Sequence, residues 1–177
     1  MTPDDVARRL TELLDVPAST VGGTASADVA RERWVASATA VRDDPALDAR
    51  FFDVLLGVDL LDDGFEVVAR LWSVAGRHGV LLRTRCPRDD AHVPSLSGVF
   101  AGASWHEREI AEMLGIDVTD HPGLEPLLLP TGFAAHPLRK EFVLARRDPG
   151  AWPGAVEPGS STPNPRRLPP GAPGRRR

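Results

Sequence analysis

The sequence predicts an α+β fold, in which N-terminal helices precede an antiparallel sheet of three to four strands and a capped helix follows the sheet. Three observations support this prediction. The first 42 residues carry apolar side chains at helical spacing, residues 51–86 contain three strand-like runs separated by turn signals, and the C-terminal residues are rich in proline, glycine and arginine. We therefore expect an α+β domain over residues 1–145 and an extended or disordered Pro/Gly/Arg-rich tail over residues 146–177.

Two helices are predicted before the sheet. Residues 3–5, Pro-Asp-Asp, suit a first helical turn, because proline fits the first helical position and acids are stabilised at the positive end of the helix dipole. Pro17 ends this segment, and a second helix is predicted from about Ala27 to Arg42, with the Asp-Asp-Pro of residues 43–45 as its stop. The apolar stripe of the first helix consists of Val6, Leu10, Leu13 and Leu14.

Three strands are predicted in the middle of the chain. They cover Phe51–Asp59, Phe65–Val74 and Val80–Cys86, and turn signals separate them at residues 61–64 and 76–79. Asp-Gly between apolar runs is a strong hairpin signal, and the second connection is also short. The expected topology is therefore an antiparallel meander.

Composition excludes several kinds of function. No run approaches the roughly 18 apolar residues that a membrane-spanning helix needs, and the acidic N-terminus lacks the features of a signal peptide. The single cysteine, Cys86, cannot form an internal disulfide or supply the four thiolates that an iron–sulfur cluster usually takes. No glycine-rich nucleotide-binding motif occurs. We expect a cytoplasmic protein that meets a membrane only through its partners.

The charge is unevenly distributed along the chain. Seven arginines against two acidic residues give residues 146–177 a charge of +5, which leaves −9 on residues 1–145 out of the total of −4. An acidic body argues against nucleic acid as the main partner, because contacts to phosphates dominate that affinity.

A short capped helix is predicted after the sheet. Ser104 is expected at its N-cap, with Glu107 completing a capping box, and Gly115 at its left-handed C-terminal position. Arg108 and Glu112 are four residues apart, so an ion pair along the exposed side would explain both. Because three consecutive charged residues of this helix point in different directions, at least one is expected to face a partner.

A metal site and a nucleophile are the catalytic alternatives. Four possible ligands match no H-E-x-x-H pattern, and a histidine before proline is a good turn residue, which accounts for two of them without a metal. No G-x-S-x-G motif occurs, and Cys86 before Pro87 is expected to be a packed thiol. We therefore expect neither a metal nor a catalytic residue in this chain. The four possible ligands are His106, Glu109, His121 and His136.

A longer pattern extends from the predicted helix toward the C-terminus. An aromatic residue is followed by E-R-E, an acidic position, G-I and H-P-x-L, and finally by P-L-R-K and an acid. This pattern resembles the signature of the 30-kilodalton (C) subunit of proton-pumping NADH:quinone oxidoreductase (respiratory complex I). Glu112 and Glu141 stand where relatives usually carry aspartate, which keeps the charge. The matching positions are Glu107, Arg108, Glu109, Glu112, Gly115, Ile116, His121, Pro122, Leu124, Pro137, Leu138, Arg139, Lys140 and Glu141.

The resemblance implies a cofactor-free subunit in the peripheral arm of this respiratory-chain translocase. Iron–sulfur clusters, flavin, NADH and quinone would belong to partners, namely a large quinone-site subunit (D-like) and iron–sulfur subunits (B-like and I-like). The chain would then be a peripheral membrane protein on the cytoplasmic face of the cell (plasma) membrane, non-catalytic itself within an electron-transport enzyme, the NADH dehydrogenase. The expected interface residues are Glu107, Arg108, Glu109, Glu112, His121, Pro122, Arg139, Lys140 and Glu141.

Two alternatives remain open from the sequence. Arg139 and Lys140 can bridge the glutamates of the predicted helix within the fold, or they can reach carboxylates on a partner. The resemblance also fits the equivalent subunit of an energy-converting membrane-bound NiFe hydrogenase or of a formate hydrogenlyase-like complex. Nickel-binding cysteines in the neighbouring large subunit would distinguish those complexes.

Overall fold

The structure is a computed structural model that describes residues 1–143 of the 177. Residues 1–142 form one compact unit. The tail predicted over residues 146–177 lies outside the described residues, so the domain boundary near residue 145 stays a prediction. Within the described part, no helix combines the length and the apolar character needed to cross a membrane. Residues 1–143 also contain three short 3-10 helices, at Arg31–Arg33, Leu61–Asp63 and Arg88–Asp90.

Helix α1 (Pro3–Leu14) confirms the first predicted helix, and its own sequence caps it. The Thr2 hydroxyl accepts a hydrogen bond from the backbone N–H of Asp5, while the Asp5 carboxylate accepts one from the backbone N–H of Thr2. This reciprocal arrangement is a capping box, which satisfies two backbone donors at the helix start. The helix buries one face through Val6, Ala7, Leu10 and Leu14.

The helix predicted over Ala27–Arg42 begins too early, because a hairpin occupies the residues before it. β1 (Ala18–Val21) and β2 (Thr24–Asp28) pair antiparallel around two glycines that have positive φ. Ala25, Ser26 and Ala27 of β2 are all buried, and such a run of small residues gives no clear apolar periodicity in a sequence. After the 3-10 helix at Arg31–Arg33, α2 runs from Trp34 to Asp43.

The predicted meander is confirmed. β3 (Phe51–Asp59), β4 (Phe65–Ser73) and β5 (His78–Cys86) pair antiparallel in sequence order. β2 adds to β5 in parallel, so the sheet of the described residues has five strands in the order β1-β2-β5-β4-β3. The sheet is mostly antiparallel, which confirms the α+β class. β6 (His92–Pro94) and β7 (Asp117–Thr119) form a separate parallel pair.

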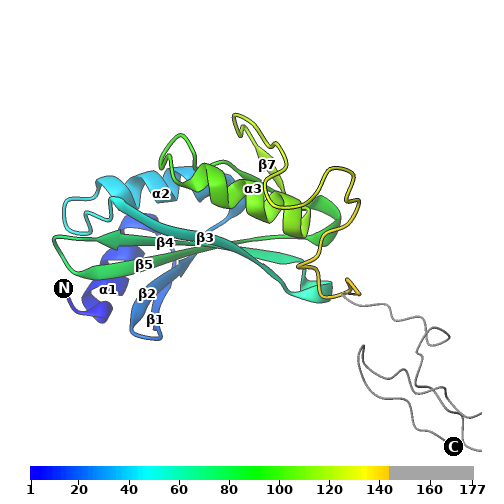
Figure 1. The fold of residues 1–177 in the computed structure, drawn as a ribbon. Helices are drawn as coiled ribbons and strands as arrows, with labels where there is room; N and C mark the ends of the chain where they lie inside the picture. The colour runs from blue at the N-terminus through cyan, green and yellow to red at the C-terminus, as the bar shows by residue number, and fades with distance from the viewer. Residues whose placement is uncertain (144–177) are drawn as a thin grey trace, which may run out of the picture. The chain divides into compact units, whose positions relative to one another are not determined.

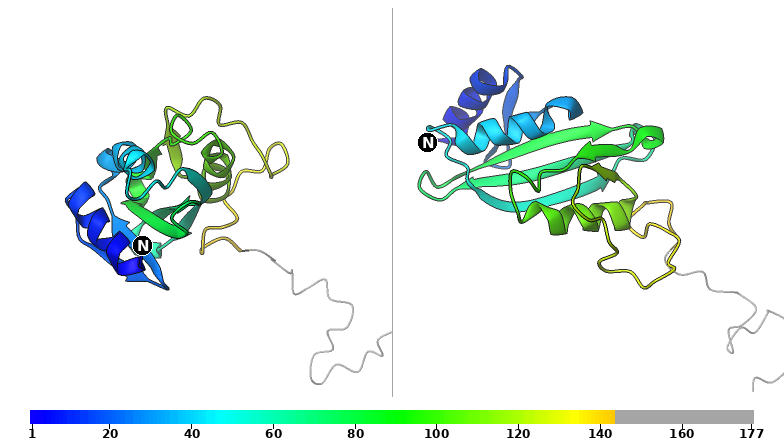
Figure 2. Two further views of the ribbon diagram at one scale, coloured as in Figure 1. Left: turned by 90° about the vertical axis from the view of Figure 1, so that its left-hand side faces the viewer. Right: turned by 90° about the horizontal axis from the view of Figure 1, so that it is seen from above.

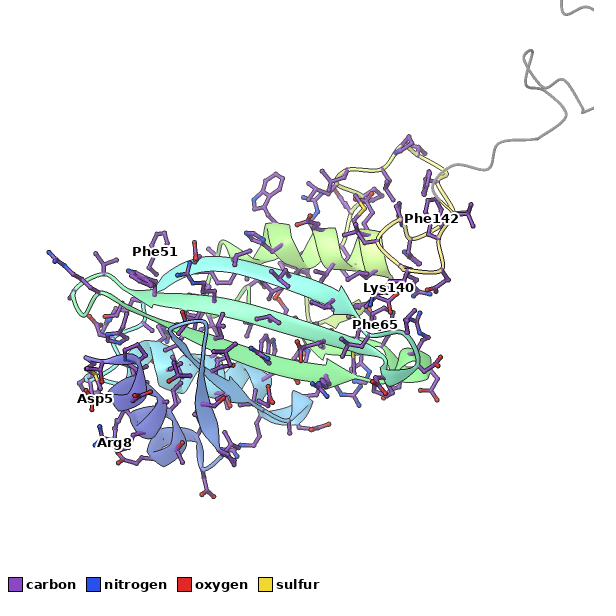
Figure 3. The ribbon with its side chains drawn as sticks, turned by 90° about the horizontal axis from the view of Figure 1, so that it is seen from below. Asp5, Arg8, Phe51, Phe65, Lys140 and Phe142 are labelled. Carbon is purple, nitrogen blue, oxygen red and sulfur yellow. The ribbon has the colours of Figure 1, made fainter. Side chains whose placement is uncertain are left out.

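The helices and the sheet form two layers. Every second residue of β4 is buried, and these inward side chains join those of α1, α2 and α3 (Ala103–Leu114) in one core cluster. Figures 1 and 2 show α2 and α3 over the same face of the sheet. The view from below in Figure 3 shows the opposite face of β3 and β4, which no helix of the described residues covers. Trp34, Leu71 and Leu96 are fully buried between the layers.

Gly57 of β3 lies against the side chains of Ile110 and Leu114 of α3, and it offers a test of this packing. A Cβ atom at Gly57 would clash with the side chain of Leu114. We expect Gly57→Val to lower the free energy of unfolding by about 1–3 kcal/mol, because overpacking forces neighbouring side chains away from their preferred rotamers. Urea denaturation of the full chain measures this loss.

The matched control is Gly98→Ala. A Cβ atom at Gly98 meets nothing within 4 Å, so this variant is expected to change the free energy of unfolding by less than about 0.5 kcal/mol. Equal losses in the two variants would contradict the close contact between α3 and β3.

Candidate functional site

The start of α3 gives Glu107 a role different from the predicted one. The helix begins at Ala103 and no side chain caps it, so the capping box expected from Ser104 and Glu107 is wrong. Starting at Ala103 puts Glu107 on the inward stripe of the helix, where only 1% of it is exposed. Its carboxylate accepts hydrogen bonds from the backbone N–H of Leu96 at 2.5 Å and from the Ser95 hydroxyl at 2.7 Å. Glu107 therefore ties the turn before α3 to the helix.

His121 returns the chain to the start of α3. The backbone N–H of Gly123 donates to His121 Nδ1 at 2.9 Å, so Nε2 carries the ring proton. Nε2 lies 3.0 Å from the hydroxyl and 3.2 Å from the carbonyl oxygen of Ser104, and 3.8 Å from a carboxylate oxygen of Glu107. The exposed Pro122 follows at once. The His-Pro step thus serves as a turn, as its residue types indicate.

Arg108 and Glu112 do not form the predicted ion pair, and each side chain binds other described residues instead. Arg108 donates from Nε and Nη2 to the carbonyl oxygens of Glu125 and Pro126, each at 2.9 Å. Glu112 accepts three consecutive backbone N–H groups, those of residues 127–129, at 3.2, 2.7 and 2.9 Å. Both side chains therefore hold the backbone of one loop against α3.

The three N–H groups also shift the acidity of Glu112. Burial raises its pKa, but the hydrogen bonds from the backbone of residues 127–129 and the nearby charge of Arg108 outweigh burial, and the net pKa lies below the ordinary value of 4.5. The carboxylate is thus held in its charged form, in which both oxygens accept hydrogen bonds.

The second part of the signature closes the C-terminal end of α3. Three groups bind successive carbonyl oxygens of the last helical turn. His136 Nδ1 lies 2.8 Å from the carbonyl oxygen of Glu112, and the backbone N–H of Leu138 donates to the carbonyl oxygen of Met113 at 3.0 Å. Arg139 Nε donates to the carbonyl oxygen of Leu114 at 2.6 Å. Carbonyl groups in a last helical turn have no partner within the helix. The positive charge of Arg139 is also favourable at the negative end of the helix dipole.

Of the two alternatives for Arg139 and Lys140, bridges to the glutamates of α3 do not occur among the described residues. Arg139 serves the helix backbone instead, and its guanidinium lies 5.4 Å from the centre of the Phe65 ring. Lys140 contributes its backbone N–H to Asp59, while its side chain is exposed.

Asp59 fastens the end of the same segment to the sheet. Its buried carboxylate accepts the backbone N–H groups of Leu61 at 2.8 Å and Lys140 at 2.9 Å, and it pairs with Arg88. Arg88 also pairs with Glu141 at 3.0 Å. Burial raises the pKa of Asp59, but the two N–H groups and the charge of Arg88 outweigh it, so the pKa lies below the ordinary value of 3.8. Arg88 and Asp59 were not predicted, because their partners are distant in sequence.

Residues 120–142 contain no helix or strand, and the hydrogen bonds described above fix the course of their backbone. The backbone of this segment is bound from the inside, while several of its large apolar side chains are exposed. A surface cavity of about 380 Å³ also opens in the segment, between Glu112, Phe133 and His136. The sequence gives one signal for this surface, since three leucines stand between Pro126 and Pro130. The exposed side chains are Leu124, Leu128, Phe133 and Leu138.

The nine predicted interface residues divide into three groups. Glu109 and the side chain of Lys140 have no hydrogen bond or ion pair with any described residue. Pro122 lies in a turn. The other six use their side chains inside the chain, and these are Glu107, Arg108, Glu112, His121, Arg139 and Glu141.

The possible metal ligands have separate surroundings. His106 packs edge-on against the Phe52 ring, with the ring centres 5.5 Å apart, whereas His121 and His136 bind backbone atoms at opposite ends of α3. Over residues 1–143, no group of three or more metal-binding side chains comes together. Cys86 is buried, and burial raises the pKa of its thiol, as expected for a packed cysteine.

Comparison with known proteins gives consistent matches. Residues 27–148 match the family model described as respiratory-chain NADH dehydrogenase, 30 Kd subunit. The C subunit of the NADH-quinone oxidoreductase of Roseiflexus castenholzii is 41% identical over 128 residues, which cover 71% of this chain and 74% of that protein. The equivalent protein of Mycolicibacterium gilvum, which has the same name, is 39% identical over 123 residues, covering 66% of this chain and 53% of that protein.

Two solved structures share the fold. A trypsin-resistant fragment (1-134) of Nqo5 aligns with a TM-score of 0.57 at 23% identity, over 70% of this chain and 99% of the fragment. A chain of an archaeal membrane-bound sulfane sulfur reductase aligns with a TM-score of 0.70 at 19% identity, over 80% of this chain and 85% of its own. At these identities the two structures support the fold alone.

The Asp59 contacts predict a pH dependence of stability. The pKa of Asp59 is lower in the folded chain than in the unfolded chain. The contribution of the Asp59 carboxylate to stability is therefore complete above pH 3.8 and declines as the pH falls through the folded pKa. Urea denaturation of the wild type and Asp59→Asn should therefore show the variant less stable at pH 7, with the difference shrinking below pH 3.8. A difference that stays constant down to pH 3 would contradict the buried, charged state of Asp59.

Proposed function

Because the chain belongs to the family of the 30 kDa subunit of respiratory-chain NADH dehydrogenase, we propose that it holds neighbouring subunits of NADH:quinone oxidoreductase together through one docking surface. The docking surface comprises the exposed side of α3 and residues 120–142. The role is structural, and the chain binds no cofactor of its own.

One observation carries this proposal, namely the orientation of side chains in residues 120–142. Charged side chains of α3 bind the backbone of the segment, while Leu128 and Leu138 remain 56% and 55% exposed. Trp105 of α3 is also 62% exposed. Exposed apolar side chains that gather on one surface are typical of a protein–protein interface. A hydrogen-bonded segment with outward apolar residues therefore favours a surface that a partner covers.

The proposed partners follow from the family. They are the large quinone-site subunit (D-like) and iron–sulfur subunits (B-like and I-like), which would carry the redox groups. We propose a location on the cytoplasmic face of the membrane, where the chain is held by these partners. Glu109 and Lys140 contribute charges that partners can pair with at the interface.

The curated relatives favour this complex over the hydrogenase alternative. Proteins that match over two thirds or more of this chain are named as subunits of NADH-quinone oxidoreductase. The likeness to the sulfane sulfur reductase is one of fold and does not distinguish between complexes of this architecture.

The docking surface predicts a specific assembly defect. We expect Leu128→Asp to reduce recovery of the assembled complex about tenfold, because a buried interface leucine is replaced by a charge that loses its hydration. Co-purification of the partner subunits from membranes, together with NADH:quinone reductase activity, measures the effect.

The control for this experiment is Val74→Asp. Val74 is 69% exposed in the turn after β4, away from the docking surface. The control should assemble like the wild type, and both isolated chains should unfold at the same urea concentration. Normal assembly of Leu128→Asp would rule out the docking surface.

A further inference from the structure

The sheet ends at β3, which pairs with β4 in regular register over residues 54–59, after a register shift between Phe52 and Val54. This strand has nine residues, and no other strand of the described residues follows it in the sheet. The stretch 54–58 is uncharged, while Asp53 and Asp59 at its two ends are engaged by Arg70 and Arg88. The opposite edge strand, β1, has only four residues. Long apolar edge strands without a bulky or charged guard readily pair with another chain.

The register identifies the free backbone groups of this edge. The backbone N–H of Leu60 donates to the carbonyl oxygen of Gly64, so Leu60 and Gly64 form a hydrogen-bonded pair between the ends of the two strands. Hydrogen-bonded and non-bonded pairs alternate in an antiparallel ladder, so Leu56 and Val58 bind β4. The N–H and carbonyl groups of Leu55 and Gly57 therefore point away from β4, toward the free edge.

Helix α3 runs beside this edge. Figures 1 and 3 show it along β3, and the ring of His106 lies against Phe52 of the strand. Glu109 and Met113 are three and seven residues after His106, so all three share the flank of the helix on this side. Glu109 is half-buried and has no hydrogen bond or ion pair with a described residue. The Glu109 carboxylate is thus on the same flank of α3 as His106, which contacts β3.

We propose that the free edge of β3 and the Glu109 flank of α3 form an edge site, which accepts an extended segment of a neighbouring subunit as an added strand. Backbone hydrogen bonds to Leu55 and Gly57 supply binding, and a lysine or arginine of the incoming segment pairs with Glu109. The inference rests on the proposed function only in taking the neighbour to be a subunit of the same complex.

Charge favours a different chain over a second copy of this one. β3 contains no lysine or arginine, so two copies paired through β3 would offer each Glu109 no cation from the paired strand. The first 145 residues carry a net charge of −9, which further disfavours self-association. A basic extended segment from another subunit meets neither obstacle.

Hydrogen exchange at single-amide resolution tests the edge site, with the full-length chain compared free and within the purified complex. We expect the amides of Leu55 and Gly57 to exchange quickly in the free chain and about tenfold or more slowly in the complex. The amides of Leu56 and Val58 should be protected in both. Equal exchange of Leu55 and Gly57 in the two states would overturn the inference.

Two other outcomes would also overturn it. Protection that grows with the concentration of the free chain would indicate a second copy, and protection at every concentration would indicate another part of this chain. In the complex, Glu109→Lys should remove much of the protection of Leu55 and Gly57, whereas Glu32→Lys, on an exposed 3-10 helix, should not. Unchanged protection in Glu109→Lys would contradict the role of its charge.

The test separates this inference from the proposed function. If Leu128→Asp impairs assembly while the β3 edge stays unprotected in the complex, the edge site alone is wrong. If the chain does not co-purify with the complex at all, the proposed function is wrong.

Discussion

The carbonyl groups in the last turn of α3 have no partner within the helix, and the course of residues 120–142 depends on the groups that satisfy them. His136, Leu138 and Arg139 donate to three successive carbonyl oxygens. A buried backbone group left without a partner costs about 1–3 kcal/mol. The segment therefore keeps a defined course although it contains neither helix nor strand, since leaving α3 would expose these groups together.

Glu112 and Arg108 complete this attachment from the helix side. They bind backbone donors and acceptors of residues 125–129, so the polar atoms of the segment are used internally. Apolar side chains that cannot reach the core then remain on the outside. The charged signature thus acts mainly by giving the segment a shape in which Leu124, Leu128 and Phe133 are exposed, and in the proposed function these side chains face a partner. In the proposed function, preorganisation of this surface favours binding, because little conformational entropy remains to be lost on docking.

Local patterns predicted much of the fold. The N-terminal helix, the three-strand meander and the left-handed Gly115 each depend on residues close in sequence, and all three are present. The hairpin of β1 and β2 was missed because the buried residues of β2 are two alanines and a serine, and these small residues give no clear apolar periodicity. The role of Glu107 could not be predicted, since its partners, Ser95 and Leu96, precede the helix and meet it only through tertiary packing.

The same limit applies to the candidate site. The sequence pattern selected nine candidate interface residues but did not predict the direction in which each side chain points. A pair four residues apart, such as Arg108 and Glu112, satisfies the rule for a helical ion pair. The folded chain instead offers both residues a loop backbone, which binds each of them through two or three hydrogen bonds. Glu109 is the position for which an outward role remains the best interpretation.

The most direct measurement is hydrogen exchange of the amides of residues 127–129 in the full-length chain carrying Glu112→Gln or Glu109→Gln. We expect faster exchange of these amides in Glu112→Gln, because the neutral amide offers one acceptor oxygen where the carboxylate binds three N–H groups through two oxygens. Glu109→Gln should leave their exchange unchanged. Equal exchange in both variants, whether unchanged or accelerated, would contradict the claim that the signature charges fix the docking surface from within.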